Sequence, residues 1–213
     1  MAISLPRNKW RRSSATVNQY HILAFDPGGT TGWAHLLLDY KAFSRPETKA
    51  LSWLDSWHCG EITGSELDKL DKCAALIWGF HFPNEFNSRL DVVSEGFDLK
   101  QLIGSQANLL SPVRINAVIN WECRKQGLEL HIQDRSARSA QTPARLNAFG
   151  FTGKWSPNGT GKDAFAALQH AVTWLRRVKE KSKSQPWKLS DGVGRYWDCA
   201  CYEGELCDLN HPK

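Results

Sequence analysis

An apolar run that ends in an aspartate and a glycine-rich turn constrains the fold of this chain more than any other segment. Residues 20–25 read YHILAF, a run whose length and composition predict a buried strand. Asp26 follows, and residues 27–32 read PGGTTG, a composition typical of a tight turn. A second apolar run, WAHLLL at 33–38, predicts a second strand. The segment is therefore expected to form a hairpin with a carboxylate at its turn.

The rest of the chain predicts strands that alternate with helices. A third strand is expected at 53–62, after a loop that contains Pro46, and Ser65 begins a helix with acidic residues in its first turn. Further strands are expected at 90–94 and 128–132, and further helices at 106–126, 142–149 and 162–179. Pro112 is expected to mark a helix start. The order β-β-β-α-β-α-β-α predicts an α/β fold with a five-stranded mixed sheet flanked by helices.

The length of 213 residues suits one domain with short extensions. Residues 1–18 are expected to form a basic flexible arm, 19–183 the domain, and 184–213 a short Cys-rich C-terminal extension. The net charge is +5, and basic side chains gather at 1–12 and 176–188, which suits either nucleic acid or a solvated helix face. The chain has no apolar run of membrane-spanning length and no secretory signal, so we expect a cytoplasmic protein without a membrane partner.

The six cysteines are expected to be thiols or metal ligands, because disulfides are rare in the cytoplasm. Potential Zn²⁺ ligands fall close together in the C-terminal extension: Cys199, Cys201, Cys207 and His211. Their C-x-C-x5-C-x3-H spacing is not a common zinc pattern, so a zinc site and a chance cluster both stay open. The remaining cysteines are expected to be small buried side chains: Cys59, Cys73 and Cys123.

Three acidic residues lie where a catalytic site on an open α/β sheet would need them. Asp26 and Glu95 each end an apolar run, and Asp163 opens the helix expected at 162–179. Taken singly, each has an ordinary explanation, as a turn cap, a surface residue or a first-turn acid. Together they predict a site for Mg²⁺ or Mn²⁺, because converging carboxylates need a cation and oxygen ligands suit these ions. Two such ions about 3.5–4 Å apart can clamp the attacking and leaving oxygens of a phosphodiester.

Three segments carry a resemblance to a known family. Residues 22–34 read ILAFDPGGTTGWA, residues 92–95 read VVSE, and residues 163–173 read DAFAALQHAVT. In this order they resemble the first strand, the glutamate-bearing strand and the final helix of RuvC-like Holliday-junction resolvases, especially phage-encoded ones. The similarity covers roughly residues 20–180 and implies a ribonuclease H-like fold.

The resemblance also implies a function: a metal-dependent DNA endonuclease that resolves Holliday junctions or other branched DNA by hydrolysing phosphodiester bonds. Asp26 would be the ligand shared by two Mg²⁺ or Mn²⁺ ions, and Glu95 and Asp163 would complete the catalytic site. Enzymes of this family work as homodimers, since two symmetric nicks resolve a two-fold junction. A phage-encoded member would act in the cytoplasm of its bacterial host.

One position departs from the family pattern. The family's final helix offers two metal-facing side chains three residues apart, with an aspartate at the second position, where this chain has Ala166. Either a natural aspartate has been replaced by alanine in an engineered inactive variant, or the natural protein lacks this ligand and Asp163 takes the role of the final acid. We favour the first explanation, because the flanking residues fit the family, and we expect this chain to cut DNA little or not at all.

Two other functions stay open. The chain could be a non-catalytic branched-DNA-binding protein that kept the fold and lost a ligand. The turn after Asp26 also resembles the first phosphate-binding loop of sugar kinases and actin-like ATPases, but these need two facing domains, for which the chain is short. His170 lies about 10 Å along the helix from Asp163, too far to share a metal with it, so it is expected to pack or to contact DNA, with packing favoured. Some basic residues could meet phosphates or be plain surface charges: Arg135, Arg138, Arg145, Lys154 and Lys162.

Overall fold

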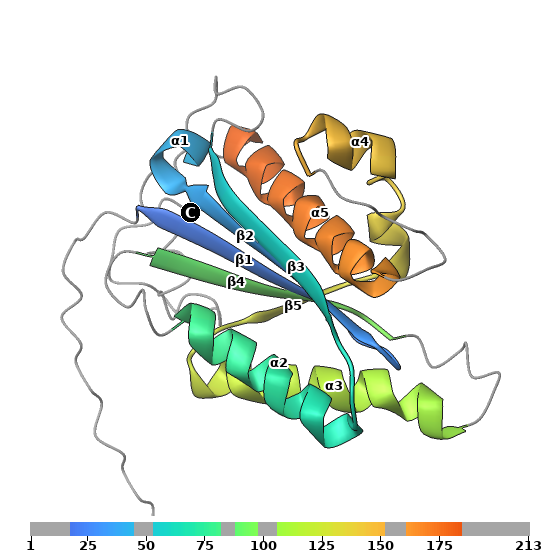
Figure 1. Cartoon of the computed structure of the whole chain (residues 1–213). Helices are drawn as coiled ribbons and strands as arrows, with labels where there is room; N and C mark the ends of the chain where they lie inside the picture. The colour runs from blue at the N-terminus through green and yellow to red at the C-terminus, as the bar shows by residue number, and fades with distance from the viewer. Residues whose placement is uncertain (1–17, 45–52, 82–87, 98–105, 152–160, 185–213) are drawn as a thin grey trace, which may run out of the picture.

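The computed structural model describes residues 18–44, 53–81, 88–97, 106–151 and 161–184. Its five strands form one mixed sheet in the order β3-β2-β1-β4-β5 (Figure 1). The strands are β1 Gln19–Asp26, β2 Thr31–Asp39, β3 Leu54–Ile62, β4 Ser88–Glu95 and β5 Leu130–Gln133. β1, β2 and β3 pair antiparallel, whereas β4 runs parallel to both β1 and β5. This strand order and direction confirm the expected ribonuclease H-like fold.

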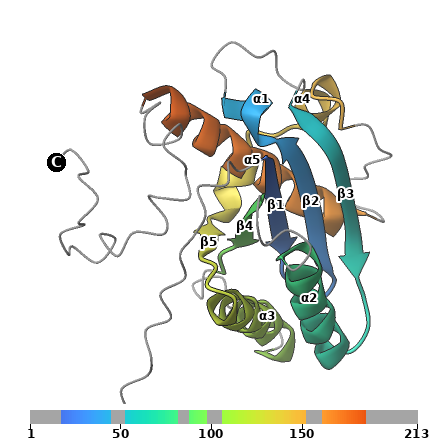
Figure 2. The same ribbon diagram turned by 90° about the vertical axis from the view of Figure 1, so that its left-hand side faces the viewer.

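Helices cover both faces of the sheet (Figures 1 and 2). One face carries α2 and α3, and the other carries α5, with α1 and α4 beside it. The helices are α1 Tyr40–Ser44, α2 Glu66–His81, α3 Gln106–Lys125, the 3₁₀ helix η3 Arg135–Arg138, α4 Pro143–Ala148 and α5 Lys162–Ser184. Among these described helices, none is both long and apolar enough to cross a membrane.

Side chains of the sheet alternate between two cores, as a sheet buried on both faces requires. The even-numbered β1 residues Tyr20, Ile22 and Ala24 pack with α5, whereas Leu23 and Phe25 pack with α2 and α3. The apolar stripe of α5 fills the first core: Phe165, Ala167, Leu168, Ala171, Val172 and Leu175. The same alternation decides whether the side chain at each strand end points toward α5 or toward α2 and α3.

Most expected elements are present, and three details differ. The expected loop after the second strand contains α1, which begins because Asp39 Oδ1 accepts hydrogen bonds from the backbone N–H groups of Lys41 and Ala42. η3 was not anticipated either. The expectation that Pro112 starts a helix is wrong: α3 begins at Gln106 and continues through the proline at the cost of one backbone hydrogen bond.

The expected burial is confirmed for Cys73 and Cys123, which are fully buried, whereas Cys59 is only half-buried. Residues 1–17 of the N-terminal arm and residues 185–213 of the C-terminal extension lie outside the described residues. The four potential zinc ligands also lie there: Cys199, Cys201, Cys207 and His211.

Candidate metal centre

Asp26 and Glu95 are the last residues of two neighbouring parallel strands, β1 and β4. The register pairs Phe25 with Ser94, so the two acidic residues follow at the same edge of the sheet. Both lie on the α5 face, because Asp26 shares the parity of Ala24 and Glu95 that of Val93, which pack with α5. Their side chains are only 12% and 16% exposed. The convergence expected from the sequence is therefore present for this pair.

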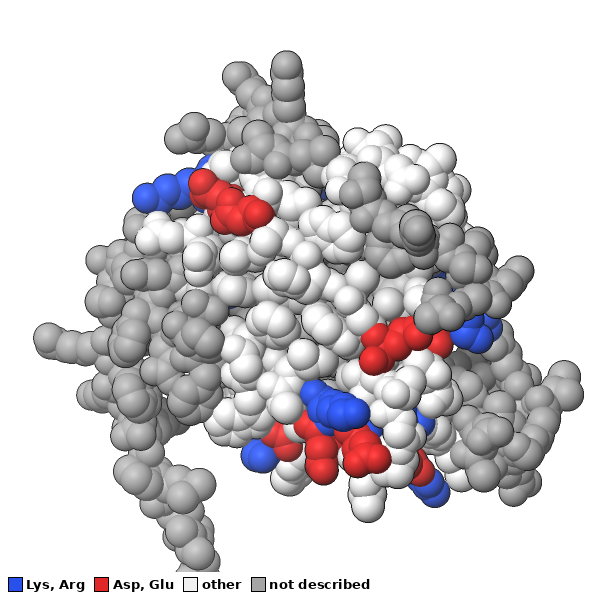
Figure 3. All heavy atoms as spheres, in the orientation of Figure 1, with Lys and Arg blue, Asp and Glu red and all other residues white. Residues whose placement is uncertain are grey.

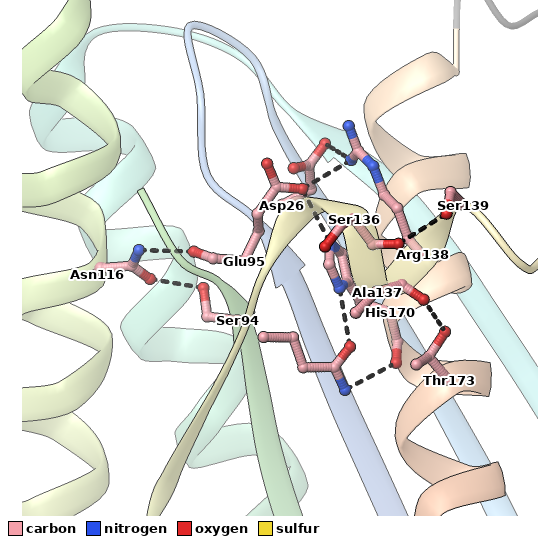
Figure 4. Close-up of polar contacts among 11 residues, drawn as sticks. Asp26, Ser94, Glu95, Asn116, Ser136, Ala137, Arg138, Ser139, His170 and Thr173 are labelled. Carbon is pink, nitrogen blue, oxygen red and sulfur yellow. Dashed lines mark hydrogen bonds and ion pairs between the residues drawn. The ribbon is translucent and has the colours of Figure 1, made fainter. Parts of the chain in front are cut away.

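His170 reaches this pair from α5. Its side chain is fully buried, and its Nε2 lies 2.9 Å from Glu95 Oε2 (Figure 4). One ligand atom from each of Asp26, Glu95 and His170 lies within 4.8 Å of the other two. His170 is thus far from solvent, as the sequence suggested, but it belongs to the polar site and not to the apolar core. Its distance along the helix from Asp163 does not matter, because its partner is on β4.

Gln133, the last residue of β5, determines which imidazole nitrogen carries the proton. Its Nε2 donates to the backbone oxygen of His170 over 3.4 Å, so its Oε1 faces the ring and accepts from Nδ1 over 3.0 Å. In a neutral imidazole, Nε2 then presents a lone pair to Glu95. Two acceptors at 2.9 Å need a proton or a cation between them. The hydrogen-bond pattern therefore fits a metal ligand whose tautomer is fixed by a second residue.

A guanidinium lies between the two carboxylates. Arg138 ends η3, and its Nη1 is 3.2 Å from Asp26 Oδ2 and 2.9 Å from Glu95 Oε2 (Figure 4). These are ion-pair distances, but the angles do not satisfy hydrogen-bond geometry, and Nη1 is buried. A single positively charged nitrogen thus touches one oxygen of each acid. The site holds a cation where the two carboxylates alone would repel each other.

The protonation of the pair reflects this crowding. Burial raises the pKa of Asp26 and the charge of Glu95 raises it further, to about 7, although Arg138 opposes the shift. Burial also acts to raise the pKa of Glu95, but the hydrogen bond with His170 and the charge of Arg138 outweigh it, and the pKa is lowered overall. Asp26 is therefore only partly ionised near neutral pH unless another cation takes the place of its proton.

The end of β4 is held to α3 by an amide. Asn116 Nδ2 donates to the backbone oxygen of Glu95 over 2.9 Å, and its Oδ1 accepts from Ser94 Oγ over 2.6 Å (Figure 4). These two hydrogen bonds fix the end of β4, from which the side chain of Glu95 enters the site.

Lys69 of α2 holds the glycine turn that follows Asp26. Its Nζ donates to the carbonyl oxygen of Gly29 over 2.9 Å, with longer contacts of 3.4 Å to Gly28 O and Ser111 Oγ. The side chain is buried, so the ammonium group depends on these acceptors. β1, the turn and α2 are thereby joined immediately beside the first acid.

Asp163 lies in the first turn of α5, outside the group of ligand atoms formed by Asp26, Glu95 and His170. Its backbone N–H donates to Glu61 Oε1 over 3.1 Å, which satisfies one of the unpaired donors at the helix start. Burial raises the pKa of Asp163, Lys162 opposes this shift, and Glu61 adds to it. The charge of Asp163 in turn raises the pKa of Asp26, which places it beside the pair electrostatically.

The helix start is close to the sheet because β2 has a glycine there. A Cβ atom on Gly32 would overlap the backbone carbonyl of Asp163, whereas one on Gly29 would meet nothing within 4 Å. Gly32 also pairs with Asp26 on one side and with Glu61 on the other. Of these two glycines in the turn motif, Gly32 is thus the one that the position of α5 requires.

Ala166 lies on the same face of α5 as Asp163 and His170, three residues after the first and four before the second. It is 6% exposed. A carboxylate at this position would lie between the rim of the site and its buried end.

The donor set fits a divalent cation. Asp26 and Glu95 supply oxygens, as Mg²⁺ and Mn²⁺ prefer, and His170 supplies a nitrogen that Mn²⁺ also accepts. The sequence predicted that Asp26 and Glu95 converge, gave His170 a packing role and left Arg138 as a phosphate contact or a surface charge; it did not point to Gln133. The one available signal was the helical spacing that puts His170 on the face of Asp163.

Fold and site together define a ribonuclease H-like protein with a carboxylate-rich candidate metal centre. No protein-family model matches the chain, and no curated protein sequence does. Among solved structures, it is similar to T. thermophilus RuvC in complex with Holliday junction substrate, with a TM-score of 0.47 and 11% identity over 72% of this chain and 91% of that one. It is also similar to a second Thermus thermophilus RuvC structure, with a TM-score of 0.44 and 12% identity over 75% and 97%. At this identity, the likeness concerns the fold alone.

Proposed function

We propose that this chain is a metal-dependent, structure-selective DNA endonuclease that hydrolyses phosphodiester bonds in Holliday junctions or other branched DNA. The observation that carries the proposal is the arrangement of Asp26, Glu95 and His170, whose ligand atoms meet at one end of the sheet around a cationic nitrogen. The resemblance of the sequence segments around these residues supplies the class of substrate.

In the proposed mechanism, Asp26 and Glu95 would hold Mg²⁺ or Mn²⁺, with His170 beside them and Asp163 as a further acid at the rim. Such a cation lowers the pKa of a bound water and stabilises charge on the phosphate oxygens. The burial of the acids keeps competing water away and strengthens their interaction with a cation. Gln133 keeps the lone pair of His170 directed at the site.

DNA is proposed to approach from the side of η3 and the start of α5. On the face shown in Figure 3, the basic side chains of the described residues lie next to acidic ones, with large uncharged areas between them. Arg135 and Lys162 are exposed on the elements that carry Arg138 and Asp163, and they would meet DNA that approaches from this side. A homodimer, with one such site on each subunit, would suit a two-fold junction.

A cleavage assay tests the proposal. A labelled four-way junction and a linear duplex of the same sequence are incubated with Mg²⁺, Mn²⁺ or chelator, at several salt concentrations, because phosphate contacts are salt-dependent. We expect metal-dependent nicks in the junction, weak in this chain because of Ala166, and none after Glu95→Gln. Glu66→Gln is the matched control, because Glu66 lies away from the site and forms an exposed ion pair with Arg114. Because the parent chain cuts little, both substitutions are also made in the Ala166→Asp protein, and equal, detectable cutting by the Glu95→Gln and Glu66→Gln forms would contradict the proposal.

The second candidate is a non-catalytic branched-DNA-binding protein, and Ala166 is the observation that favours it. It predicts tight junction binding without metal-dependent cutting, even after Ala166→Asp. The same assay, run with this variant, separates the two functions.

A further inference from the structure

We infer that Arg138 is an internal cation that exchanges partners during the proposed reaction: it bridges Asp26 and Glu95 in the absence of metal and pairs with the DNA phosphate when a divalent ion binds. The inference rests on the proposed function and adds a residue to it. This exchange would make metal and DNA bind cooperatively. The metal would free Arg138 for the phosphate, and the phosphate would draw Arg138 away from the oxygens that the metal needs.

The contacts of Arg138 show that it and a metal ion compete. Its Nη1 lies 3.2 Å from Asp26 Oδ2 and 2.9 Å from Glu95 Oε2, so it uses oxygens that a metal would bind. Two cations a few ångströms apart repel each other strongly in a partly buried site. The guanidinium must therefore move away from the carboxylates before an ion can bind to both.

The backbone of Arg138 cannot follow such a movement far. α5 fastens the segment at two points: Thr173 Oγ1 donates to Ala137 O over 3.3 Å, and Gln169 Nε2 donates to Gln141 O over 2.6 Å. The backbone oxygen of Arg138 itself accepts from the N–H of Gln141 over 2.9 Å. Only the side chain is then able to swing, and it stays next to the metal centre.

A phosphate is the partner that chemistry offers there. A phosphodiester bound at the metal centre brings negative oxygens next to the displaced guanidinium, which pairs with phosphate through two parallel N–H bonds. The side chain is 17% exposed, so it already borders solvent on the side from which DNA would come. A lysine would replace the charge but not the two-pronged geometry.

The test is Mn²⁺ binding to the DNA-free protein, measured by calorimetry and electron paramagnetic resonance at about pH 8, well above the ordinary pKa of a carboxyl group. We expect Arg138→Gln to bind Mn²⁺ roughly tenfold tighter or more than the unchanged protein, because the competing charge is gone. Arg138→Lys should bind Mn²⁺ like the unchanged protein. Arg135→Gln is the matched control, since it removes the same charge from an exposed position of η3.

Two further arms keep the outcomes apart. Glu95→Gln should lose Mn²⁺ binding. If it does, but Arg138→Gln binds no tighter than Arg135→Gln, the role of Arg138 is overturned and the metal site stands. Equal Mn²⁺ affinity in all variants overturns both. In the unchanged protein, a saturating four-way junction should raise Mn²⁺ affinity, and Mn²⁺ should raise junction affinity by the same factor. If the junction leaves Mn²⁺ affinity unaltered, the inference fails even without a variant.

Discussion

The imidazole of His170 and the carboxylate of Glu95 lie 2.9 Å apart, although 75 residues separate them in the chain. The contact joins the middle of α5 to the end of β4 across the face of the sheet. Gln133 binds Nδ1 of the ring and so orients it. Nε2 then faces Glu95 and the candidate metal position. Three elements of the sheet and helix layers thus determine one ligand.

The orientation of His170 yields the first prediction. Gln133→Leu removes the acceptor of Nδ1–H, so the ring loses its fixed tautomer, and Mn²⁺ affinity should fall about 10–100-fold. Calorimetric titration measures this. Gln126→Leu is the control, because both atoms of that amide are buried without a hydrogen-bond partner. Equal Mn²⁺ affinities in the two variants would show that the ring needs no such support.

The two acids could be located from the sequence, but the histidine could not. Asp26 and Glu95 each end an apolar run, and strands of a parallel pair end at one edge, so local pattern was enough. The position of His170 depends on how α5 crosses the sheet. Its partner lies on β4, and no spacing along the helix reports that distance.

Asp26 makes the stability of the protein depend on pH when no metal is bound. Its folded pKa of about 7, raised first by burial and then by Glu95, lies above the ordinary value of 3.8. The stabilising contribution of its proton is therefore complete below pH 3.8 and is lost as the pH rises through about 7. Asp26→Asn should raise the free energy of unfolding by about 1–3 kcal/mol near pH 8 and by less near pH 5.

Urea unfolding in the presence of chelator measures this difference, with Asp55→Asn as an exposed control on β3. A stability increase of the same size at both pH values would refute a role for the proton. Added Mn²⁺ should reverse the ranking, because only the unchanged protein keeps the full set of ligands.

Two buried histidines on the opposite face of the sheet make the protein less stable as the pH falls, whereas Asp26 makes it less stable as the pH rises. His21 Nδ1 lies 3.0 Å from His35 Nε2, and burial lowers their pKa values to about 4 and about 3. Both are protonated more readily in the unfolded chain, so stability is complete above pH 6.5 and falls as the pH drops towards the folded values. At pH 5 the cost should be about 2 kcal/mol for each histidine.

The double variant His21→Leu/His35→Phe should lose this acid sensitivity, measured as the change in unfolding free energy between pH 7 and pH 5 in the Asp26→Asn background. His58→Gln is the control, because His58 is exposed at the end of the same histidine row. An unchanged pH slope in the double variant would exclude the pair as its source.

The sequence could not distinguish Arg138 from a surface charge. An arginine in a polar segment after a short strand has the same local pattern whether it faces solvent or two carboxylates. The difference arises from η3, which turns the chain back over the strand ends and is fastened to α5 through Thr173. Such a turn has no periodic signal to predict it.

The glycines after Asp26 should differ sharply in their tolerance of a methyl group. Gly32→Ala places its Cβ against the carbonyl of Asp163, so the start of α5 must move; we expect a loss of about 1–3 kcal/mol in stability and a weaker site. Gly29→Ala is the matched control, since nothing lies within 4 Å of its added atom. Thermal unfolding and Mn²⁺ binding measure both effects, and equal behaviour of the two variants would mean that α5 is not held by this contact.

Ala166 offers the last prediction, because its place between Asp163 and His170 is where another acid would complete the centre. Ala166 is only 6% exposed, so the Ala166→Asp substitution buries a carboxylate. Without metal, this substitution should lower the free energy of unfolding by about 3 kcal/mol. Mg²⁺ should restore this loss, and junction cleavage should rise at least about tenfold. Ala167→Asp is the control: this residue is fully buried in the apolar core, so its cost should not respond to Mg²⁺. If Mg²⁺ rescues both variants or neither, position 166 is not part of the metal centre, and the non-catalytic DNA-binding function becomes the better explanation.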